Sequence, residues 1–136
     1  MTFFGKIIQV ISLFTAAIIA HLGGWDKALE ILVILVISDY ITGVLGAIIE
    51  KKLSSKIGAK GIAKKIALFV VVALAFQVDR YLNIDVLRTV AIGFYIANEG
   101  LSILENLAEM GVPFPQKLKD MLAQIRSENN SEGEES

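Results

Sequence analysis

The sequence has no cysteine and a single histidine, His21, among its 136 residues. Disulfide bonds and thiolate chemistry are therefore excluded, and so is a metal centre built on several histidines. No serine, histidine and aspartate stand at a spacing that indicates nucleophilic catalysis, and no glycine-rich loop follows a strand pattern to hold a phosphate. These absences predict a protein that is not an enzyme and uses no cofactor.

Charge is also scarce over long stretches of the chain. Hydrophobic residues make up 54% of it, and its mean hydropathy is +0.63. Residues 28–49 form an apolar run in which Asp39 is the only charged residue after Glu30, near its start. Because ~20 residues at ~1.5 Å each cross a hydrocarbon layer as a helix, this run predicts a transmembrane helix. The fold class is therefore expected to be all-α, a small integral membrane protein.

Three further segments, 7–25, 66–78 and 86–110, are candidate spans. The first reads as an uncleaved span, because more apolar runs follow it instead of a soluble domain. The third run is short and becomes adequate if Lys65 and Asp79 lie at the two interfaces. The last carries one arginine and three glutamates, so it either crosses within a bundle or lies flat as an amphipathic helix. We expect four spans.

A basic block follows the 28–49 run, and it predicts the orientation. Short loops rich in lysine stay in the cytoplasm, so with four spans both termini are cytoplasmic and the turn at 22–26 is external. The block either binds anionic lipid, at ~1 kcal/mol per base, or only sets the orientation. It lacks interleaved aromatic residues, so nucleic acid is not an expected partner. Its lysines are Lys51, Lys52, Lys56, Lys60, Lys64 and Lys65.

The chain divides into three parts by composition. Residues 1–112 form the predicted helical transmembrane domain. Pro113 and Pro115 close its last helix, and 113–126 is an amphipathic C-terminal segment that contains a short cytoplasmic helix at 116–125. Residues 127–136 are polar and acidic without an aromatic residue, which predicts a disordered tail.

Polar residues inside the predicted spans are the candidate functional groups. A carboxylate mid-span costs roughly 2.5–3.5 kcal/mol, so it should face protein or water, or carry a proton. In the last span, polar residues recur every three or four positions and share one helix face. This face either lines an aqueous pore or lies at the cytoplasmic surface, and Asp39 either joins that pore or makes an interhelical hydrogen bond. The pore-lining candidates are Asp39, Asn98, Glu99, Ser102, Glu105 and Asn106.

Small residues recur at four-residue spacing in the second and fourth predicted spans. Such stripes allow helix backbones to approach closely in a membrane. They indicate tight packing either within one subunit or between subunits. The candidate packing residues are Ser38, Thr42, Gly43, Gly46, Gly93 and Ala97.

Several motifs resemble one known family. These are residues 39–43 (DYITG), the segment 53–65 with Gly58 and Gly61, Asp79 after the third run, residues 94–106 (FYIANEGLSILEN) and residues 111–115 (GVPFP). Together they resemble the phage holin family that includes the toxin-secretion and phage lysis holins of the holin family 4 type. The similarity extends over about residues 28–122, and the segment from Asn98 to Asn106 is its most specific part.

The resemblance implies a small phage or prophage protein of the host cytoplasmic membrane that forms homo-oligomers and opens lesions. Endolysin then reaches the wall, or a toxin leaves the cell, without direct binding to the lesion-forming protein. Two other functions fit the residues: a small proton- or cation-coupled transporter working through Glu99 or Asp39, and a membrane anchor or scaffold. The family supplies no established functional residues to transfer. The next methionine after Met1 is Met110, so a second start at a nearby methionine is absent.

Overall fold

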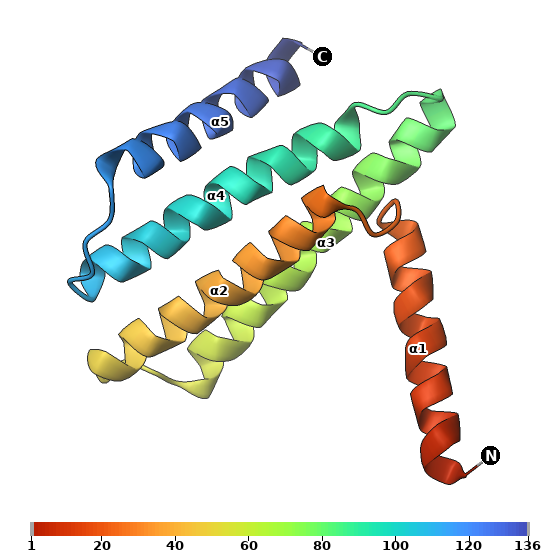
Figure 1. Ribbon diagram of the computed structural model, residues 1–136, viewed down its shortest axis with the longest axis horizontal. Helices are drawn as coiled ribbons and strands as arrows, with labels where there is room; N and C mark the ends of the chain where they lie inside the picture. Colours follow the sequence, from red (N-terminus) through yellow and green to blue (C-terminus); the bar gives the residue numbers. More distant parts are fainter. Residues whose placement is uncertain (1, 136) are drawn as a thin grey trace.

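The computed structural model describes residues 2–135, with side chains described through residue 130. This part of the chain forms five α-helices. Figure 1 shows α2, α3 and α4 side by side in a bundle, with α1 pointing away from it and α5 lying along α4. The helices are α1 (Phe3–His21), α2 (Lys27–Ile49), α3 (Ser55–Leu82), α4 (Leu87–Glu109) and α5 (Gln116–Glu135).

Side-chain caps fix where the first three helices begin. The hydroxyl of Thr2 accepts a hydrogen bond from the backbone N–H of Gly5, at 3.1 Å. Asp26 caps α2 through the N–H of Leu29 at 2.9 Å, and Ser54 caps α3 through the N–H of Ile57 at 3.2 Å. Each cap satisfies a donor that the first helical turn leaves without a partner.

Helix α3 begins earlier than the apolar run predicts. It contains residues 55–65, so most of the basic block is helical and only residues 50–54 connect α2 to α3. The expectation of a lysine loop is therefore wrong for Lys56, Lys60, Lys64 and Lys65. Lysine is a good helix former, and the Ser54 cap allows the helix to start there. At 28 residues α3 is ~42 Å long, which exceeds the ~30 Å hydrocarbon layer.

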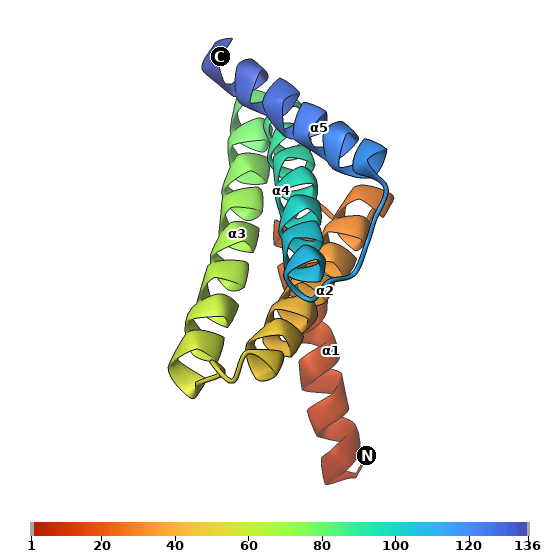
Figure 2. The ribbon, with the colours of Figure 1, turned by 90° about the vertical axis from the view of Figure 1, so that its left-hand side faces the viewer.

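Helices α2 and α4 run in the same direction, and α3 runs opposite to both. Asp26 and Asp39 of α2 contact Arg88 and Asn106 of α4 in the same order along the two chains. Along α3 the order is reversed, since Lys65 contacts Glu99 and Asp79 contacts Leu87. Figure 2 shows α4 lying over both α2 and α3, with α5 on its outer side. Thus α4 holds the bundle together.

The apolar core occupies the half of the bundle near the α1–α2 and α3–α4 turns. Its fully buried members are Leu29 and Leu32 of α2, Val72 of α3 and Ile92 of α4. The other half of the bundle contains the buried polar residues described below. One half of the helical interface is therefore dry and the other is polar.

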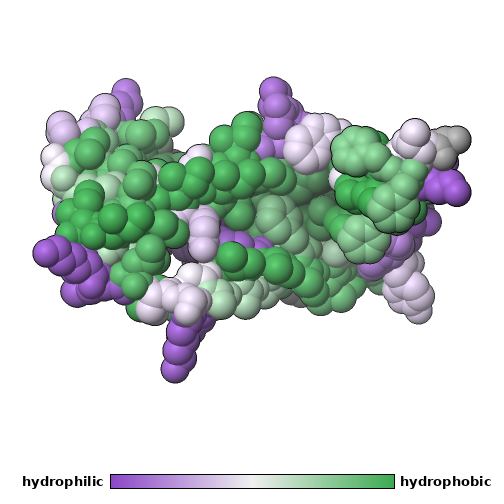
Figure 3. All heavy atoms as spheres, turned by 90° about the horizontal axis from the view of Figure 1, so that it is seen from below, coloured by the Kyte–Doolittle hydropathy of each residue, from purple (hydrophilic) through white to green (hydrophobic). Residues whose placement is uncertain are grey.

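Helices α1, α2 and α3 are long and apolar enough to cross a membrane. Helix α1 has no buried residue, and its large side chains such as Phe4 and Phe14 are exposed. Much of the molecular surface is hydrophobic, and Figure 3 shows one such face with hydrophilic side chains projecting from it. A surface of this kind is suited to the hydrocarbon interior of a lipid bilayer.

Within the described residues, α4 is not among the helices that are both long and apolar enough to cross a membrane. Length and composition therefore do not establish a fourth span. Its 23 residues are ~34 Å long, which is sufficient for a span. Its composition is the obstacle, because Arg88, Glu99, Glu105 and Glu109 lie on it.

The C-terminal segment differs from the sequence prediction. Helix α5 continues to Glu135, so the disorder expected for 127–136 is not what the described residues show. Tertiary packing explains part of the difference, because α5 lies against α4 in the opposite direction: Leu122 faces Gly100 and Asn129 faces Gly93. Ser136 lies outside the described residues.

Candidate functional site: a buried ion network

Three helices bring two carboxyl groups to one ammonium group. Lys65 of α3 is hydrogen-bonded to Asp39 of α2, and its Nζ donates to Glu99 Oε2 of α4 at 2.6 Å. The carboxyl side chains are 7% and 5% exposed. Asp39 lies ten residues before α2 ends at Ile49, ~15 Å along the axis. The network therefore sits near the middle of the bundle.

Asn106 extends this network along α4. Its Nδ2 donates to Asp39 Oδ1 at 3.0 Å, to the Asp39 backbone carbonyl at 3.2 Å and to Thr42 Oγ1 at 2.9 Å. The Thr42 hydroxyl in turn donates to the carbonyl of Ser38 at 2.9 Å. Every buried polar side-chain atom in the described residues has a hydrogen-bond partner. A polar network satisfied in this way gives the three helices one specific arrangement.

Open hollows flank the network on both sides. One of about 490 Å³ lies between α3 and α4, and one of about 250 Å³ lies where α2 and α3 meet α4. A third of about 190 Å³ continues toward the α2–α3 connection. The first two share Asp39, Lys65 and Ser102, and the last two share Gly43 and Asn106. The polar interior is therefore accessible along the half of the bundle that lies away from the apolar core.

The structure brings most of the predicted pore-lining residues to this place. Asp39, Glu99 and Asn106 belong to the network, while Asn98 and Ser102 line the larger hollow. Glu105 is exposed on α4 and, among the described residues, bonds to none of these groups. The sequence does not indicate Lys65 as the central cation, because its position in a lysine-rich block indicates topology instead.

Part of the predicted small-residue stripe lies at contacts within the chain. Thr42 bonds to Asn106, and a Cβ at Gly43 would lie 3.7 Å from Asn106 Nδ2. A Cβ at Gly46 would meet nothing within 4 Å, and Ser38 donates to its own helix at Ile34. On α4, Gly93 faces α5 and Ala97 is fully buried. Whether any of these residues also contacts a second subunit stays a prediction.

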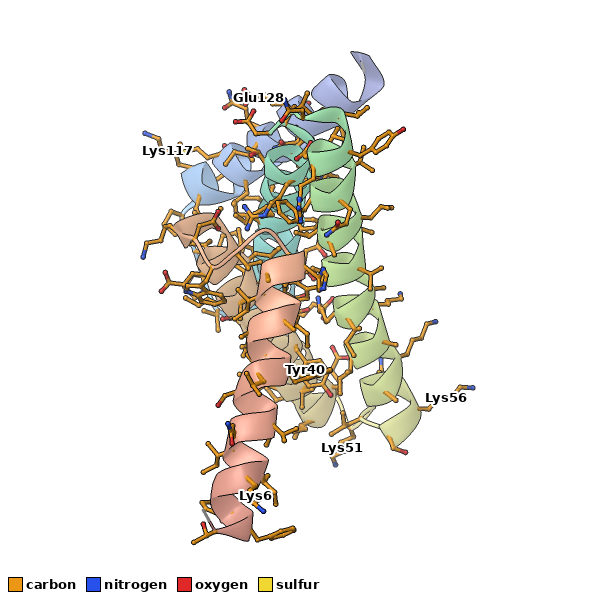
Figure 4. All side chains as sticks on the ribbon, turned by 90° about the vertical axis from the view of Figure 1, so that its right-hand side faces the viewer. Lys6, Tyr40, Lys51, Lys56, Lys117 and Glu128 are labelled. Carbon is orange, nitrogen blue, oxygen red and sulfur yellow. The ribbon has the colours of Figure 1, made fainter. Side chains whose placement is uncertain are left out.

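The remaining lysines of the basic block point to the surface. Lys51, Lys52, Lys56, Lys60 and Lys64 are exposed, in contrast to the half-buried Lys65. Figure 4 shows Lys51 and Lys56 projecting where α2 connects to α3, and Tyr40 lying between these helices. Tyr40 packs against both glycines: an added Cβ would lie 3.3 Å from its hydroxyl oxygen at Gly58 and 3.4 Å from its ring at Gly61. The two glycines thus allow α3 to approach Tyr40.

A second polar cluster closes the opposite end of the bundle. Asp79, which is 3% exposed, accepts hydrogen bonds from the backbone N–H groups of Leu87 and Arg88, each at 2.9 Å. The first turn of α4 is therefore capped by a carboxylate from α3, since Val86 supplies no cap of its own. The sequence predicts Asp79 at the membrane interface and does not indicate this capping role, because the two donors lie eight and nine residues farther along the chain.

Arg88 joins α4 to the turn between α1 and α2. Its guanidinium donates to the carbonyls of Leu22 and Gly24 and to Asp26 Oδ2, the last at 2.7 Å. The hydrogen bond from Arg88 holds the pKa of Asp26 below its usual range. Gly23, at φ +98°, faces the guanidinium, and a Cβ there would lie 2.4 Å from Arg88 Nε. Only glycine fits both that backbone conformation and that contact.

Long apolar helices around a buried ion network define a helical membrane protein. The sequence profile of the bacteriophage holin family matches residues 16–127. The chain belongs to the bacteriophage holin family, as the resemblance in the sequence motifs predicts.

Several relatives share most of the chain. A protein of Bacillus phage phi105 named "Probable holin" is 41% identical over 116 residues, covering 85% of this chain and 86% of its own length. An uncharacterized protein of Clostridium perfringens is 43% identical over 110 residues, covering 79% and 82%. One of Listeria monocytogenes is 45% identical over 101 residues, covering 74% and 72%. No solved structure matches the chain.

Proposed function

We propose that this protein acts as a holin: it forms homo-oligomers in the host cytoplasmic membrane and opens that membrane to an endolysin or a toxin. The observation that carries the proposal is the closed ion network of Asp39, Lys65 and Glu99, flanked by open hollows that reach its polar side chains, on a bundle with exposed apolar helices. Lipid in these hollows cannot hydrogen-bond the polar side chains that they reach, which is energetically costly. Assembly that turns them toward a shared aqueous lumen removes that cost.

The proposed lumen is lined by the polar face of α4. Asn98, Ser102 and Glu105 lie on its stripe that faces the hollow or solvent, and Glu99 and Asn106 join them when the network opens. Membership of the holin family supports lesion formation, and the closed network explains how subunits accumulate without leaking. A transporter working through Glu99 or Asp39 would instead move a substrate saturably and leave cells alive, and an anchor would leave the membrane sealed.

In the proposed topology α1 to α4 all cross, and the N-terminus and the α2–α3 connection are cytoplasmic. The exposed lysines at the start of α3 support this orientation. Helix α5 carries Lys117, Lys119, Asp120, Arg126 and Glu128, which lipid would not accept. Because docked α5 runs back along α4, a cytoplasmic tail requires α5 to leave α4 about residues 111–115, where Gly111 has φ +81°.

Cysteine labelling tests this topology, and the natural chain contributes no background because it lacks cysteine. We expect Trp25→Cys to react with a membrane-impermeant thiol reagent in whole cells and Ser55→Cys to react only after the cells are opened. Trp25 is 54% exposed in the α1–α2 turn, so a cysteine at this position is accessible to the reagent. Gly24 is a poorer position for the cysteine, because its φ of +93° favours glycine. If Ser55→Cys is labelled in intact cells and Trp25→Cys is not, the true orientation is the opposite of the proposed one.

Lysis timing tests the lumen. Glu99→Leu leaves Lys65 paired with Asp39, so we expect normal insertion but delayed or abolished lysis, because the lumen loses a polar group. Glu99→Gln keeps the polarity and should lyse cells with altered timing. Culture density and membrane potential are followed after induction, with and without a cytoplasmic endolysin.

Glu128→Leu is the matched control for this experiment, because Glu128 is exposed on α5 and lines none of the three hollows. It should insert and lyse like the natural protein. Normal lysis by Glu99→Leu would contradict the lumen proposal. Loss of potential without endolysin-dependent lysis, or an intact potential throughout, would contradict the holin proposal itself.

A further inference from the structure

The buried ion network has an excess of acid. It contains one ammonium group, that of Lys65, and two carboxyl groups, those of Asp39 and Glu99. If both carboxyl groups were ionised, the middle of the bundle would hold an unbalanced negative charge. An unpaired charge in such a place is so costly that the group binds a proton instead.

No second cation within the described residues balances this charge. Lys65 is the ion-pair partner of both carboxylates there, and the neighbouring Lys64 lines the hollow with its side chain exposed and pairs with neither. The other titratable groups that face the network are the phenols of Tyr40 on α2 and Tyr95 on α4, and a phenol supplies no positive charge. The described side chains of α5, through residue 130, line neither of the hollows beside the network.

The hydrogen bonds distinguish the two carboxyl groups. Asp39 accepts from Lys65 on one oxygen and from Asn106 on the other, whereas Glu99 accepts from Lys65 alone. Donors directed at a carboxylate favour its charged form, so the charge of Asp39 is better stabilised. Both carboxyl groups contact the same ammonium nitrogen, so their oxygens lie close together. Two carboxylates repel at this range, whereas a carboxylic acid and a carboxylate form a hydrogen bond.

We propose that Asp39, Glu99 and Lys65 form a proton-binding site that holds one proton in the closed subunit, located mainly on Glu99 and shared with Asp39. The bound proton makes the network electrically neutral. The hollow of about 490 Å³ lined by Asn98 and Ser102 gives water access to Glu99 from one side. When water fills the network both carboxyl groups ionise and the proton leaves, so a higher pH on the accessible side favours the open arrangement. This last consequence rests on the proposed function, whereas the proton site does not.

Infrared spectroscopy of the full chain in lipid vesicles at pH 7 tests the site directly. The natural protein should show the carbonyl stretch of a protonated carboxyl group, shifted in heavy water. Glu99→Gln and Asp39→Asn should each lose this band, because either change leaves one carboxylate against one ammonium group. Glu105→Gln is the control: its carboxyl group is exposed, so the band should remain.

Raising the pH should remove the band of the natural protein in a single transition. Absence of the band from the natural protein at pH 7 would overturn the proposal. So would its persistence in either Glu99→Gln or Asp39→Asn, since the proton would then not depend on the pair. The infrared spectrum is recorded on vesicles and involves no lysis. A negative result there contradicts the proton site alone, whereas a negative result in the lysis assay contradicts the holin function.

Discussion

Lys65→Met should sharply lower the stability of the protein and its accumulation in membranes. The change keeps the volume of the side chain but removes the one cation that two buried carboxyl groups share. Breaking a buried ion pair by removing one partner typically costs about 3–5 kcal/mol. We expect an effect of that order in thermal unfolding of the detergent-purified protein, and lower pH should restore part of the stability by protonating both carboxyl groups.

Two further variants make this experiment specific. Lys64→Met removes the adjacent, exposed lysine and should leave stability within about 0.5 kcal/mol of the natural protein. Combining Lys65→Met with Asp39→Asn and Glu99→Gln removes every charge of the network and should recover most of the loss. Equal stability of Lys65→Met and Lys64→Met would show that the network does not hold the bundle together.

Asp79→Ala should loosen the start of α4. Its carboxylate accepts two backbone hydrogen bonds, from Leu87 and Arg88, at a buried position. Hydrogen bonds to a charged group contribute about 1.5–3 kcal/mol each, so a loss of at least about 2 kcal/mol is expected. Hydrogen–deuterium exchange should show faster exchange at those two amides, together with a lower unfolding temperature.

The neighbouring acid supplies the control for this change. Asp85 is exposed in the α3–α4 connection, so Asp85→Ala should alter stability far less. Asp79→Asn keeps one acceptor oxygen and should fall between the natural protein and Asp79→Ala. Unchanged protection of Leu87 and Arg88 in Asp79→Ala would mean that α4 begins there without its tertiary cap.

The long apolar segments were predictable because a helix in hydrocarbon must satisfy its own backbone and present apolar side chains over a fixed length. Residues 28–49 therefore correspond closely to α2. The boundaries of α3 and α5 were less predictable. Lysine-rich and acidic segments are compatible with either helix or coil, and the outcome depends on a cap such as Ser54 or on packing against a neighbour such as α4.

The candidate site, like the fold, is predictable from the sequence only in part. Helical periodicity alone placed Asn98, Glu99, Ser102 and Asn106 on one side of a helix. It did not indicate what they face, because residues 26 to 67 positions apart have no local signature of contact. For that reason the sequence indicates the two partners separately: Lys65 as a topology signal, and Asp39 as either a pore group or the donor or acceptor of an interhelical hydrogen bond to an unidentified residue.

The sequence by itself determined that the chain is a helical membrane protein of the holin family, since both follow from apolar length and local motifs. Only the tertiary structure decided that Lys65 turns inward to two carboxyl groups, that Asp79 caps a helix other than its own, and that α5 covers α4. The physical reason is that each of these contacts joins distant segments. Their stability comes from burial and charge pairing, which exist only once α2, α3 and α4 are packed together.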